Sequence, residues 1–409
     1  MCYNKYTIQR GGQGPMLYGI KGQLTLKPKQ QAQVLQNIGN ARFVWNQFLN
    51  MWNQRYENNP SLPTLGEYDL NNLLPTLKKE YEFLKLSDST SLQQVSAELA
   101  GAFKKFFTNK GHFKHPRFKG KYHTRQSYTS KNVGNAIRYE NGYLRLPKIG
   151  FVRFRCGQTI KGNIKRATIR LTPSGIFECS LLVEDESQVI TTKTNQSVGI
   201  DMGVADLMVL STGDKVPTIR YDKHLSGKRL YWEKRVARRA RLAKAKDIPL
   251  SEAKNYQKAK QQRAKVFQKE KNQRMDRLHK LTTALVKEFD IIVLEDLNTS
   301  KMMKNTQLAR SIAAQSWREI RTMLAYKCVK YGKELIVVNP YKTSQICSSC
   351  GHDGGKQELS IREWLCASCH VHHDRDINAA KNILSIGLGQ ALVNQPKPLP
   401  VCPQVAQVS

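Results

Sequence analysis

Three acidic residues lie at the edges of apolar segments, where an isolated carboxylate is unusual. Asp201 follows the apolar run VGI, Glu295 follows IIVL, and Asp376 opens the helical pattern DINAAKNIL. A carboxylate in such a place loses hydration, and a divalent cation is the usual compensation. If the three elements meet in one fold, these carboxylates could hold two Mg²⁺ ions about 4 Å apart, an arrangement that hydrolyses phosphodiesters.

Each of these residues also has a purely structural interpretation. Asp376, or its neighbour Asp374, suits the cap of a helix, and Asp201 before Met-Gly suits a turn. Glu295 at the end of a strand suits a hydrogen-bond acceptor. Spacing alone does not separate Glu295 from the adjacent Asp296, or Asp376 from Asp374.

A second group of ligand-type residues is compact in the sequence. Cys347 and Cys350 form one CxxC pair, Cys366 and Cys369 form another, and 15 residues separate the two pairs. This spacing is typical of a structural Zn²⁺ site, in which two tight turns supply four thiolates in a tetrahedron. Four thiolates leave no open position on the metal, so we assign the site to structure and not to catalysis. A histidine in place of one cysteine remains an alternative. The candidates for it are His352, His370, His372 and His373.

The composition indicates a polyanionic partner. The 409 residues include 66 Lys and Arg against 32 Asp and Glu, which gives a formal net charge of +34. Self-repulsion of this size is offset when a nucleic acid accepts the charge and releases its counterions. No apolar run approaches the roughly 20 residues of a membrane span, and no segment resembles the core of a signal peptide. We therefore expect a cytoplasmic protein with no membrane partner.

Hydrophobic periodicity predicts a composite N-terminal part. The chain alternates at 17–26 and again from 113 to 190, as strands do, and follows a helical period between these segments. We predict a β-rich domain, a small barrel or sandwich, over 1–28 and 113–190. A helical module is predicted as an insertion at 29–112.

The C-terminal part has the pattern of a mixed α/β domain. Its segments follow the order strand, strand, long helical stretch, strand, helix, strand, helix. We predict this domain over 197–345 and 371–390, with the cysteine-rich segment 346–370 inserted before the last helix. The helical stretch at 228–288 contains 20 Lys or Arg against 6 Asp or Glu. The tail at 391–409 is rich in Pro, Gln and Val, and we expect it to be disordered.

Two basic segments are candidate contacts for a nucleic acid. In PRFKGKYHTRQSY at 116–128, cations alternate with aromatic rings, which suits phosphate contacts combined with stacking. A basic loop with its aromatic residues in the core fits this pattern as well. The stretch 228–288 has few acids to pair with its cations, which favours a polyanion over a solvated helix face. The cations that we select are Arg117, Lys119, Lys121, Arg125, Arg235, Arg238, Arg239 and Arg241.

Taken in order, these motifs resemble those of the TnpB proteins, which insertion sequences encode and which are relatives of type V CRISPR effectors. The matching segments are GIDMG at 199–203, LEDLN at 294–298, VNPYKTSQICSSCG at 338–351, the CxxC at 366–369 and DRDINAAKNI at 374–383. The resemblance implies an α/β RNase H-like (RuvC) nuclease domain with an inserted zinc ribbon, next to an N-terminal barrel domain with a helical insertion. By this resemblance, the catalytic residues are Asp201, Glu295 and Asp376, the second Asp of Asp-x-Asp.

The resemblance also implies an activity. TnpB proteins are endonucleases that cut double-stranded DNA beside a short motif, directed by a guide RNA transcribed from the end of the element. We therefore expect two Mg²⁺ ions at the carboxylates, one Zn²⁺ at the cysteines, and guide RNA and double-stranded DNA as partners. We also expect a monomer in a prokaryotic cytoplasm, associated with the nucleoid when bound to DNA.

Two other functions fit the same residues. One is a catalytically silent regulator of transposition, although a silent protein has no reason to keep all three carboxylates. The other is a resolvase or transposase of the same fold that acts without RNA. The large basic excess outside the nuclease motifs favours a protein that carries RNA.

Overall fold

The structure is a computed structural model of the chain. It describes residues 16–122, 125–185, 192–358 and 360–389. The tail at 391–409, for which the sequence predicts disorder, lies outside the described residues.

The described residues form two compact units. The first covers residues 16–185. The second covers residues 192–259 and 266–389, while Lys260–Lys265 fall with the first.

The first unit is built on one antiparallel sheet with the strand order β2-β6-β7-β1-β5-β4-β3. Its strands are β1 (Met16–Thr25), β2 (Gln126–Lys131), β3 (Arg138–Glu140), β4 (Tyr143–Leu146), β5 (Gly150–Cys156), β6 (Asn163–Leu171) and β7 (Phe177–Asp185). Along β7, buried side chains alternate with more exposed ones, which is the period of two that marks a half-buried strand. The edge strands β2 and β3 do not pair with each other, so the sheet is an open half-barrel.

Helices occupy the chain between β1 and β2, where the sequence has a helical period. They are α1 (Pro28–Asn58), α2 (Glu67–Glu80), the short 3₁₀ helix η1 (Glu82–Leu86) and α3 (Ser89–Thr108). Pro28 opens α1, a position where its missing N–H has no cost, and Asp88 caps α3 by accepting from the N–H of Thr90. The helices α1 and α3 contact each other and β2. Trp52 stacks on Phe103 between them, with ring centroids 3.9 Å apart.

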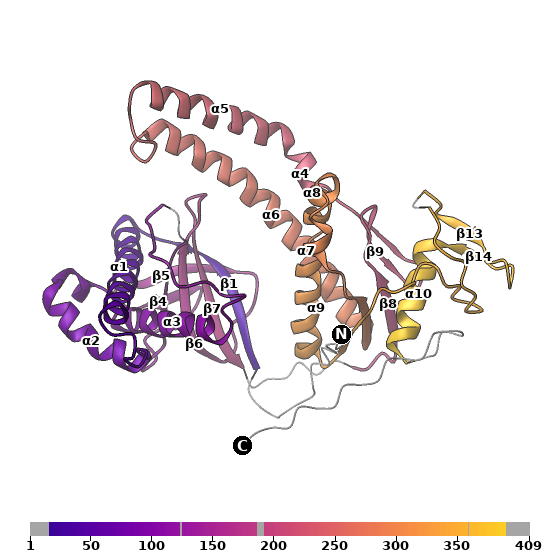
Figure 1. The fold of residues 1–409 in the computed structure, drawn as a ribbon, viewed down its shortest axis with the longest axis horizontal. Coiled ribbons are helices and arrows are strands. Elements are labelled where there is room, and N and C mark those ends of the chain that lie inside the picture. The colour runs from indigo at the N-terminus through magenta and orange to yellow at the C-terminus, as the bar shows by residue number, and fades with distance from the viewer. Residues whose placement is uncertain (1–15, 123–124, 186–191, 359, 390–409) are drawn as a thin grey trace, which may run out of the picture. The chain divides into compact units, whose positions relative to one another are not determined.

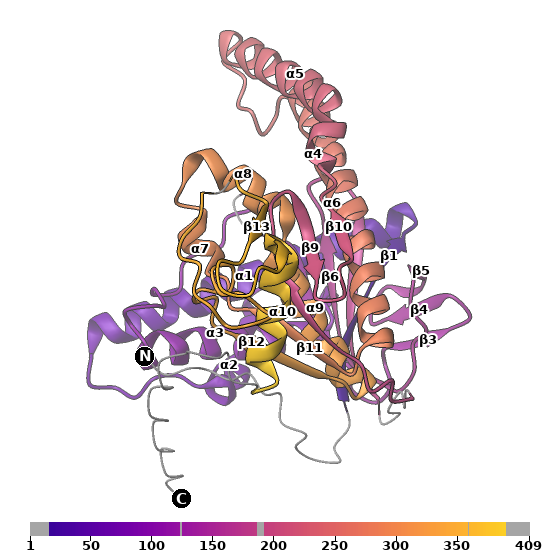
Figure 2. The ribbon, with the colours of Figure 1, turned by 90° about the vertical axis from the view of Figure 1, so that its right-hand side faces the viewer.

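The second unit is built on a five-stranded sheet with the order β10-β9-β8-β11-β12 (Figures 1 and 2). Its strands are β8 (Ser197–Asp201), β9 (Asp206–Leu210), β10 (Lys215–Pro217), β11 (Ile291–Glu295) and β12 (Glu334–Val338). The first three pair antiparallel, and β11 is parallel to both β8 and β12. Parallel neighbours end at the same edge of a sheet, so the last residues of β8 and β11 lie at one edge.

Helices cover both faces of this sheet. They are α4 (Tyr221–His224), α5 (Ser226–Ala245), α6 (Lys254–Glu288), α7 (Thr299–Met302), α8 (Thr306–Gln315), α9 (Trp317–Tyr331) and α10 (Arg375–Gly387). Ile292 and Leu294 of β11 belong to a core shared with α6 and α9, while Val293 packs with Ile383 of α10 on the other face. Figure 1 shows α10, in yellow, beside β8.

Gly199 of β8 allows α10 to approach the sheet closely. A Cβ at this position would lie 2.2 Å from the carbonyl oxygen of Ala380 and 2.6 Å from the backbone nitrogen of Leu384. Real Cβ atoms do not come this near to backbone, so any side chain at 199 would push the helix away. The first glycine of the GIDMG motif therefore has a packing role.

The basic stretch at 228–288 is not one helix but two, α5 and α6, which form the arms of a hairpin (Figure 1). The chain leaves the helical conformation at Asp247, where φ is +50°, and Pro249 follows two residues later. A proline lacks the backbone N–H and clashes with the preceding turn, so Pro249 disfavours a continuation of α5. Within the described parts of the chain, no helix is both long and apolar enough to cross a membrane.

Candidate active site

The three predicted carboxylates come from three elements of the second unit. Asp201 ends β8, Glu295 ends the neighbouring parallel strand β11, and Asp376 lies in the first turn of α10, which packs on β8. Burial and the charges of Glu295 and Asp376 raise the pKa of Asp201 to about 7, against the lowering effect of the Met202 backbone N–H and Arg375. The structure therefore brings the three carboxylates close enough to act on one another.

The two neighbouring acids have other partners. Asp374 caps α10, accepting from the backbone N–H groups of Asp376 and Ile377 at 3.0 Å, and its other oxygen pairs with the ammonium of Lys215 at 2.5 Å. Asp296 is largely exposed and forms an ion pair with Arg321. The geometry thus favours Glu295 over Asp296 and Asp376 over Asp374 as ligands at the sheet edge.

Thr343 and Arg362 also contact the carboxylates. The Thr343 hydroxyl donates to Oε1 of Glu295 at 2.7 Å; burial raises the pKa of Glu295, and this bond opposes the rise. Arg362 Nη1 lies 3.4 Å from both carboxylate oxygens of Asp376. The sequence reasoning missed both residues. Thr343 stands inside the quoted block VNPYKTSQICSSCG, but no sequence signal marks Arg362.

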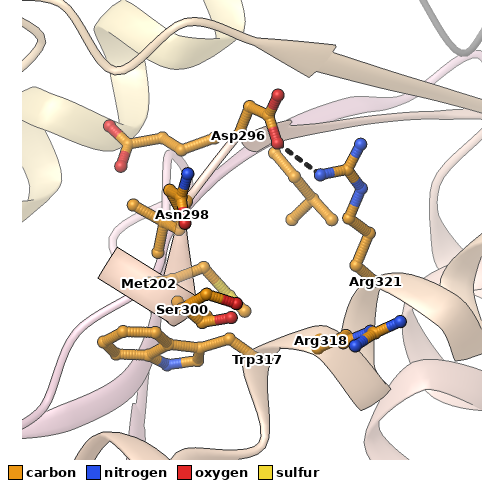
Figure 3. Close-up of a pocket in the computed structure, with 11 residues that line it drawn as sticks. Met202, Asp296, Asn298, Ser300, Trp317, Arg318 and Arg321 are labelled. Carbon is orange, nitrogen blue, oxygen red and sulfur yellow. Dashed lines mark hydrogen bonds and ion pairs between the residues drawn. The ribbon is translucent and has the colours of Figure 1, made fainter. Parts of the chain in front are cut away.

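A cavity of about 400 Å³ opens beside Glu295 (Figure 3). In Figure 3, Trp317 and Met202 lie on one side, and Asp296 with its partner Arg321 lies on the opposite side. Arg318 belongs to the same lining and makes no ion pair with any residue that the structure describes. An apolar wall with arginines at the rim suits a sugar–phosphate chain.

The donor set at the sheet edge fits a hard divalent cation. All three side chains offer oxygen, which Mg²⁺ prefers, and a bound cation would relieve the repulsion that raises the pKa of Asp201. The carboxylates are not a tight cluster, however. Among the described residues, the cysteines form the only group of three or more possible ligands whose atoms all lie within 4.8 Å of one another.

The cysteine cluster has the dimensions of a tetrahedral zinc site. Sγ of Cys347 lies 3.7 Å from Sγ of Cys369, and Sγ of Cys350 lies 3.6 Å from Sγ of Cys366. Four sulfurs bound to Zn²⁺ at about 2.3 Å are about 3.8 Å apart, whereas a disulfide would need about 2.05 Å. The backbone N–H groups of Cys369 and Ser368 lower the pKa of Cys366 to about 6, whereas burial and the neighbouring sulfurs raise the pKa values of Cys347 and Cys369. Within the cluster, the thiolate form is thus favoured at Cys366.

The two cysteine turns share one backbone design. The N–H of Gly351 donates to the carbonyl of Cys347, and the N–H of His370 donates to the carbonyl of Cys366. Gly351 and His370 each follow the second cysteine of their pair, and both have positive φ, +78° and +54°. The short strands β13 (Glu363–Leu365) and β14 (His372–Asp374) pair antiparallel and complete the ribbon.

Among the four histidines considered as ligands, His373 is the one that contacts the cluster. Its Nε2 lies 3.0 Å from Sγ of Cys347, and its ring packs on Trp364 with centroids 4.9 Å apart. The four cysteines already complete a tetrahedron, so His373 lies against a ligand sulfur and does not replace one. Contacts of this kind orient ligands at metal sites.

The basic segment 116–128 divides between the surface and the core. Arg117, Lys121 and Arg125 are exposed, as are the rings of Phe118 and Tyr122, whereas Tyr128 is buried. Lys119 differs from its neighbours, because its ammonium lies 3.5 Å from the ring centroid of Trp45 and burial lowers its pKa.

The selected arginines of α5 are accessible. Arg238 and Arg241 are exposed, and Arg239 is half-buried. None of these three makes an ion pair within the described part of the chain. Arg235 lies beside the rings of Tyr231 and Trp232, with its guanidinium carbon 5.4 and 5.6 Å from their centroids. The sequence reasoning did not single out these two aromatic residues.

Three family models match parts of the chain. The IS605 OrfB model, described as "Probable transposase", covers residues 180–306, and the Cas12f1-like TNB domain covers 317–383. A model described as a helix-turn-helix domain covers 16–60. Over those residues the structure has β1 and the single helix α1, so the helix-turn-helix description does not fit.

Two curated relatives match most of the chain. A protein of Streptomyces pristinaespiralis, named as a candidate RNA-guided DNA endonuclease, is 36% identical over 317 residues, which cover 76% of this chain and 74% of that protein. The chain belongs to the TnpB family of RNA-guided DNA endonucleases. A TnpB-family relative of Escherichia coli K12, InsQ, has the same kind of name and is 31% identical over 396 residues, 91% of this chain and 92% of its own length.

A solved structure of a Cas12f1–sgRNA–target DNA complex has a similar fold to this TnpB-family chain. The TM-score is 0.51, with 14% sequence identity, 87% of this chain covered and 82% of the other. At that identity the likeness concerns the fold alone.

Proposed function

We propose that this chain is an RNA-guided, Mg²⁺-dependent DNA endonuclease of an insertion sequence, which cuts double-stranded DNA beside a short motif through one RuvC-like site. The observation that carries the proposal is the meeting of Asp201, Glu295 and Asp376 at one sheet edge, in a chain of the TnpB family. The names of the relatives and the fold similarity to a guide-bound nuclease support it.

The topology of the second unit supports the RNase H-like assignment. Three antiparallel strands, β10, β9 and β8, are continued by the parallel pair β11 and β12 in a single sheet. A helix that follows the last strand crosses the sheet and brings its first turn to the carboxyl ends of β8 and β11. The domain limits predicted from the sequence remain predictions.

In this proposal Asp201, Glu295 and Asp376 hold the Mg²⁺ ions. When bound, such ions polarise a phosphate, lower the pKa of water and neutralise the leaving oxygen. The protein side chains position the substrate around them. Arg318 at the rim of the cavity suits a phosphate of the DNA strand, and the walls formed by Met202 and Trp317 exclude water from one side of the cleft.

The guide RNA is the natural partner of the α5–α6 hairpin in this proposal. Its cations lack acidic partners at Arg238, Arg239 and Arg241, and a polyanion relieves their mutual repulsion. Tyr231 and Trp232 add aromatic surface beside Arg235, which suits stacking on unpaired bases. Arg117, Lys121 and Arg125 supply a second basic surface in the first unit.

The requirement for RNA is tested on protein purified without nuclease treatment. We expect an absorbance ratio at 260 and 280 nm typical of a ribonucleoprotein, and sequencing should return one defined RNA. That RNA, reprogrammed at its guide segment, should redirect cleavage to a new DNA target. Sequence-independent cleavage by RNA-free protein would instead favour the resolvase-type function. Light scattering on the same sample tests the expected monomer.

The catalytic assignment is tested by Asp201→Ala, Glu295→Ala and Asp376→Ala. Each should abolish cleavage and leave RNA and target binding nearly unchanged, because every cation that faces the nucleic acid remains. Asp296→Ala is the matched control, since it removes the adjacent carboxylate, which pairs with Arg321. Near wild-type cleavage by any of the three variants would remove that residue from the site. If the wild-type protein binds its target DNA but does not cut it, the result would favour a regulator of transposition without nuclease activity.

A further inference from the structure

We propose that Thr343 is a positioning residue, which fixes the carboxylate of Glu295 for metal binding and is itself held by the zinc ribbon and α10. The inference rests on the proposed function, because it concerns the same carboxylates. It adds a hydroxyl that does not touch the metal or the DNA but determines how one ligand is presented.

The hydrogen bond between Thr343 and Glu295 is short and buried. Thr343 is 4% exposed and Glu295 9% exposed, and the hydroxyl-to-carboxylate distance is 2.7 Å. No other side chain in the described parts of the molecule donates to this carboxylate. This bond to Oε1 restrains the rotamer of Glu295, and no residue that the structure describes donates to Oε2. A buried hydrogen bond to a charged group is a stronger restraint than one between neutral groups.

Thr343 is in turn held by the last helix. The side-chain amide of Asn382, fully buried in α10, donates to the carbonyl oxygen of Thr343 at 2.8 Å and to that of Ile346 at 2.7 Å. Asn378, one turn earlier on α10, donates to Ile346 as well, at 2.8 Å. The hydroxyl that restrains Glu295 therefore belongs to a segment, Thr343 to Ile346, that is hydrogen-bonded to the helix that carries Asp376.

The same contacts connect the segment to the zinc ribbon. Ile346 precedes the ligand Cys347, and the N–H of Ser348 after it donates to Oδ1 of Asn378 at 2.8 Å. The first cysteine turn is thus bonded on both sides of Cys347 to α10. These hydrogen bonds connect the ribbon to Glu295 through Thr343, and they connect it to Asp376 through α10.

Two variants of Thr343 separate the role of its hydroxyl from the role of its shape. Thr343→Val keeps the shape and removes the donor, and Thr343→Ser keeps the donor. The readout is Mn²⁺ binding to the full-length chain, measured by electron paramagnetic resonance, together with the Mg²⁺ concentration for half-maximal cleavage. We expect Thr343→Val to weaken Mn²⁺ binding about tenfold, the usual effect of removing an outer hydrogen bond, and Thr343→Ser to restore it. Guide RNA and target binding should not change.

A buried hydroxyl elsewhere in the same unit supplies the control. The Thr282 hydroxyl, fully buried in α6, donates to the carbonyl of Leu278 and accepts from Lys327, so Thr282→Val measures the cost of losing a hydrogen-bonded hydroxyl away from the carboxylates. We expect Thr282→Val to lower the melting temperature without changing Mn²⁺ affinity. Equal Mn²⁺ affinity in Thr343→Val and wild type would overturn the proposal.

A double-mutant cycle separates positioning from general stability. In a Glu295→Ala background, Thr343→Val should have no further effect on Mn²⁺ binding, because its only target is gone. Additive losses would mean that Thr343 is merely structural and would refute the positioning role. If Asp201→Ala and Glu295→Ala leave Mn²⁺ binding intact, the failure lies with the proposed carboxylate site and not with Thr343.

Discussion

The cysteine cluster and the three carboxylates are both sets of candidate metal ligands in the second unit, yet the two sets are distributed differently along the chain. The four cysteines lie within 23 positions and are held by two local turns. The carboxylates are 94 and 81 positions apart and meet only because β8 and β11 are parallel neighbours crossed by α10. The four cysteines would fill the coordination sphere of a zinc ion, whereas Glu295 of the carboxylate set lines a cavity. A structural metal can thus be bound by two turns that are close in the sequence. The carboxylates come together only through the arrangement of the sheet and α10.

The largest effect is expected when the cysteine cluster is disrupted. Cys366→Ser should remove the zinc and unfold the ribbon, because structural zinc contributes roughly 10–16 kcal/mol in small zinc domains. Cleavage should be lost as well, since Thr343 and Asn378 connect the ribbon to the carboxylates. Metal analysis and a cleavage assay measure both effects.

The control for the cysteine variant is Cys156→Ser, at a half-buried cysteine of β5 outside the cluster. It should keep one zinc per chain and full cleavage. Zinc-free Cys366→Ser protein that cuts at the wild-type rate would show that the two sites are independent.

The next test moves the helix that completes the distributed site. Gly199→Ala places a Cβ 2.2 Å from the carbonyl of Ala380, so α10 must shift and take Asp376 with it. We expect the free energy of unfolding to fall by about 1–3 kcal/mol, as for overpacked cores, and cleavage to fall more than target binding. Zinc content should stay at one ion, because the cysteine turns are local.

Gly101→Ala is the matched control, since a Cβ at this position in α3 meets nothing within 4 Å. It should leave the protein unchanged or slightly more stable, because alanine favours a helix over glycine by up to about 1 kcal/mol. Urea denaturation of both variants compares the two sites directly. Equal effects would contradict the packing role of Gly199.

Sequence patterns predict local features better than distributed ones, and these residues show why. The cysteine spacing identifies a zinc site because each turn is closed by bonds four residues apart. The strands and helices follow from periodicity, although the break at Asp247 divides the basic stretch into two helices. No sequence signal marks Arg362, and Thr343 lies in a recognised motif that does not reveal its role, since both roles depend on carboxylates far along the chain. Barrel closure is equally hidden, because it depends on whether the edge strands β2 and β3 meet.

A weaker effect is expected at the α5–α6 hairpin, where the affinity for RNA depends on the number of cations and not on a precise geometry. Changing Arg235, Arg238, Arg239 and Arg241 together to Gln should flatten the slope of log affinity for RNA against log salt by roughly 0.7–0.9 for each phosphate that is no longer neutralised. Arg274→Gln with Lys280→Gln is the control, because both cations already pair with an acid four residues earlier. An unchanged slope in the arginine variant would make α5 a solvated helix face.

The last test concerns Lys327, a lysine of the second unit whose pKa is lowered by burial. Lys327 is 6% exposed and donates to the carbonyl of His279 and to the hydroxyls of Thr282 and Thr283, and burial lowers its pKa to about 8. Between pH 8 and 10.5 the unfolded chain binds more protons at this residue than the folded chain does. The lysine therefore makes the free energy of unfolding rise with pH in that window, by about 1–3 kcal/mol.

Lys327→Met should remove this rise. The acceptors keep a second partner, because Thr283 still donates to the carbonyl of His279 and Thr282 to that of Leu278. Urea midpoints at pH 7.5 and pH 10 measure the difference between wild type and variant. The same pH dependence in both proteins would mean that the buried amine titrates normally.

Trp232 gives the α5 arm an optical property that the rest of the molecule lacks. The chain has five tryptophans, and the other four, Trp45, Trp52, Trp317 and Trp364, are at most 8% exposed. A dissolved quencher such as acrylamide reaches a half-buried indole far more readily than buried ones, so the quenchable part of the emission belongs to α5. An RNA that covers this arm shields the indole or stacks on it, and either event changes that part of the spectrum. The hairpin thus contains an intrinsic fluorescent reporter, and its occupancy can be followed in real time without a dye.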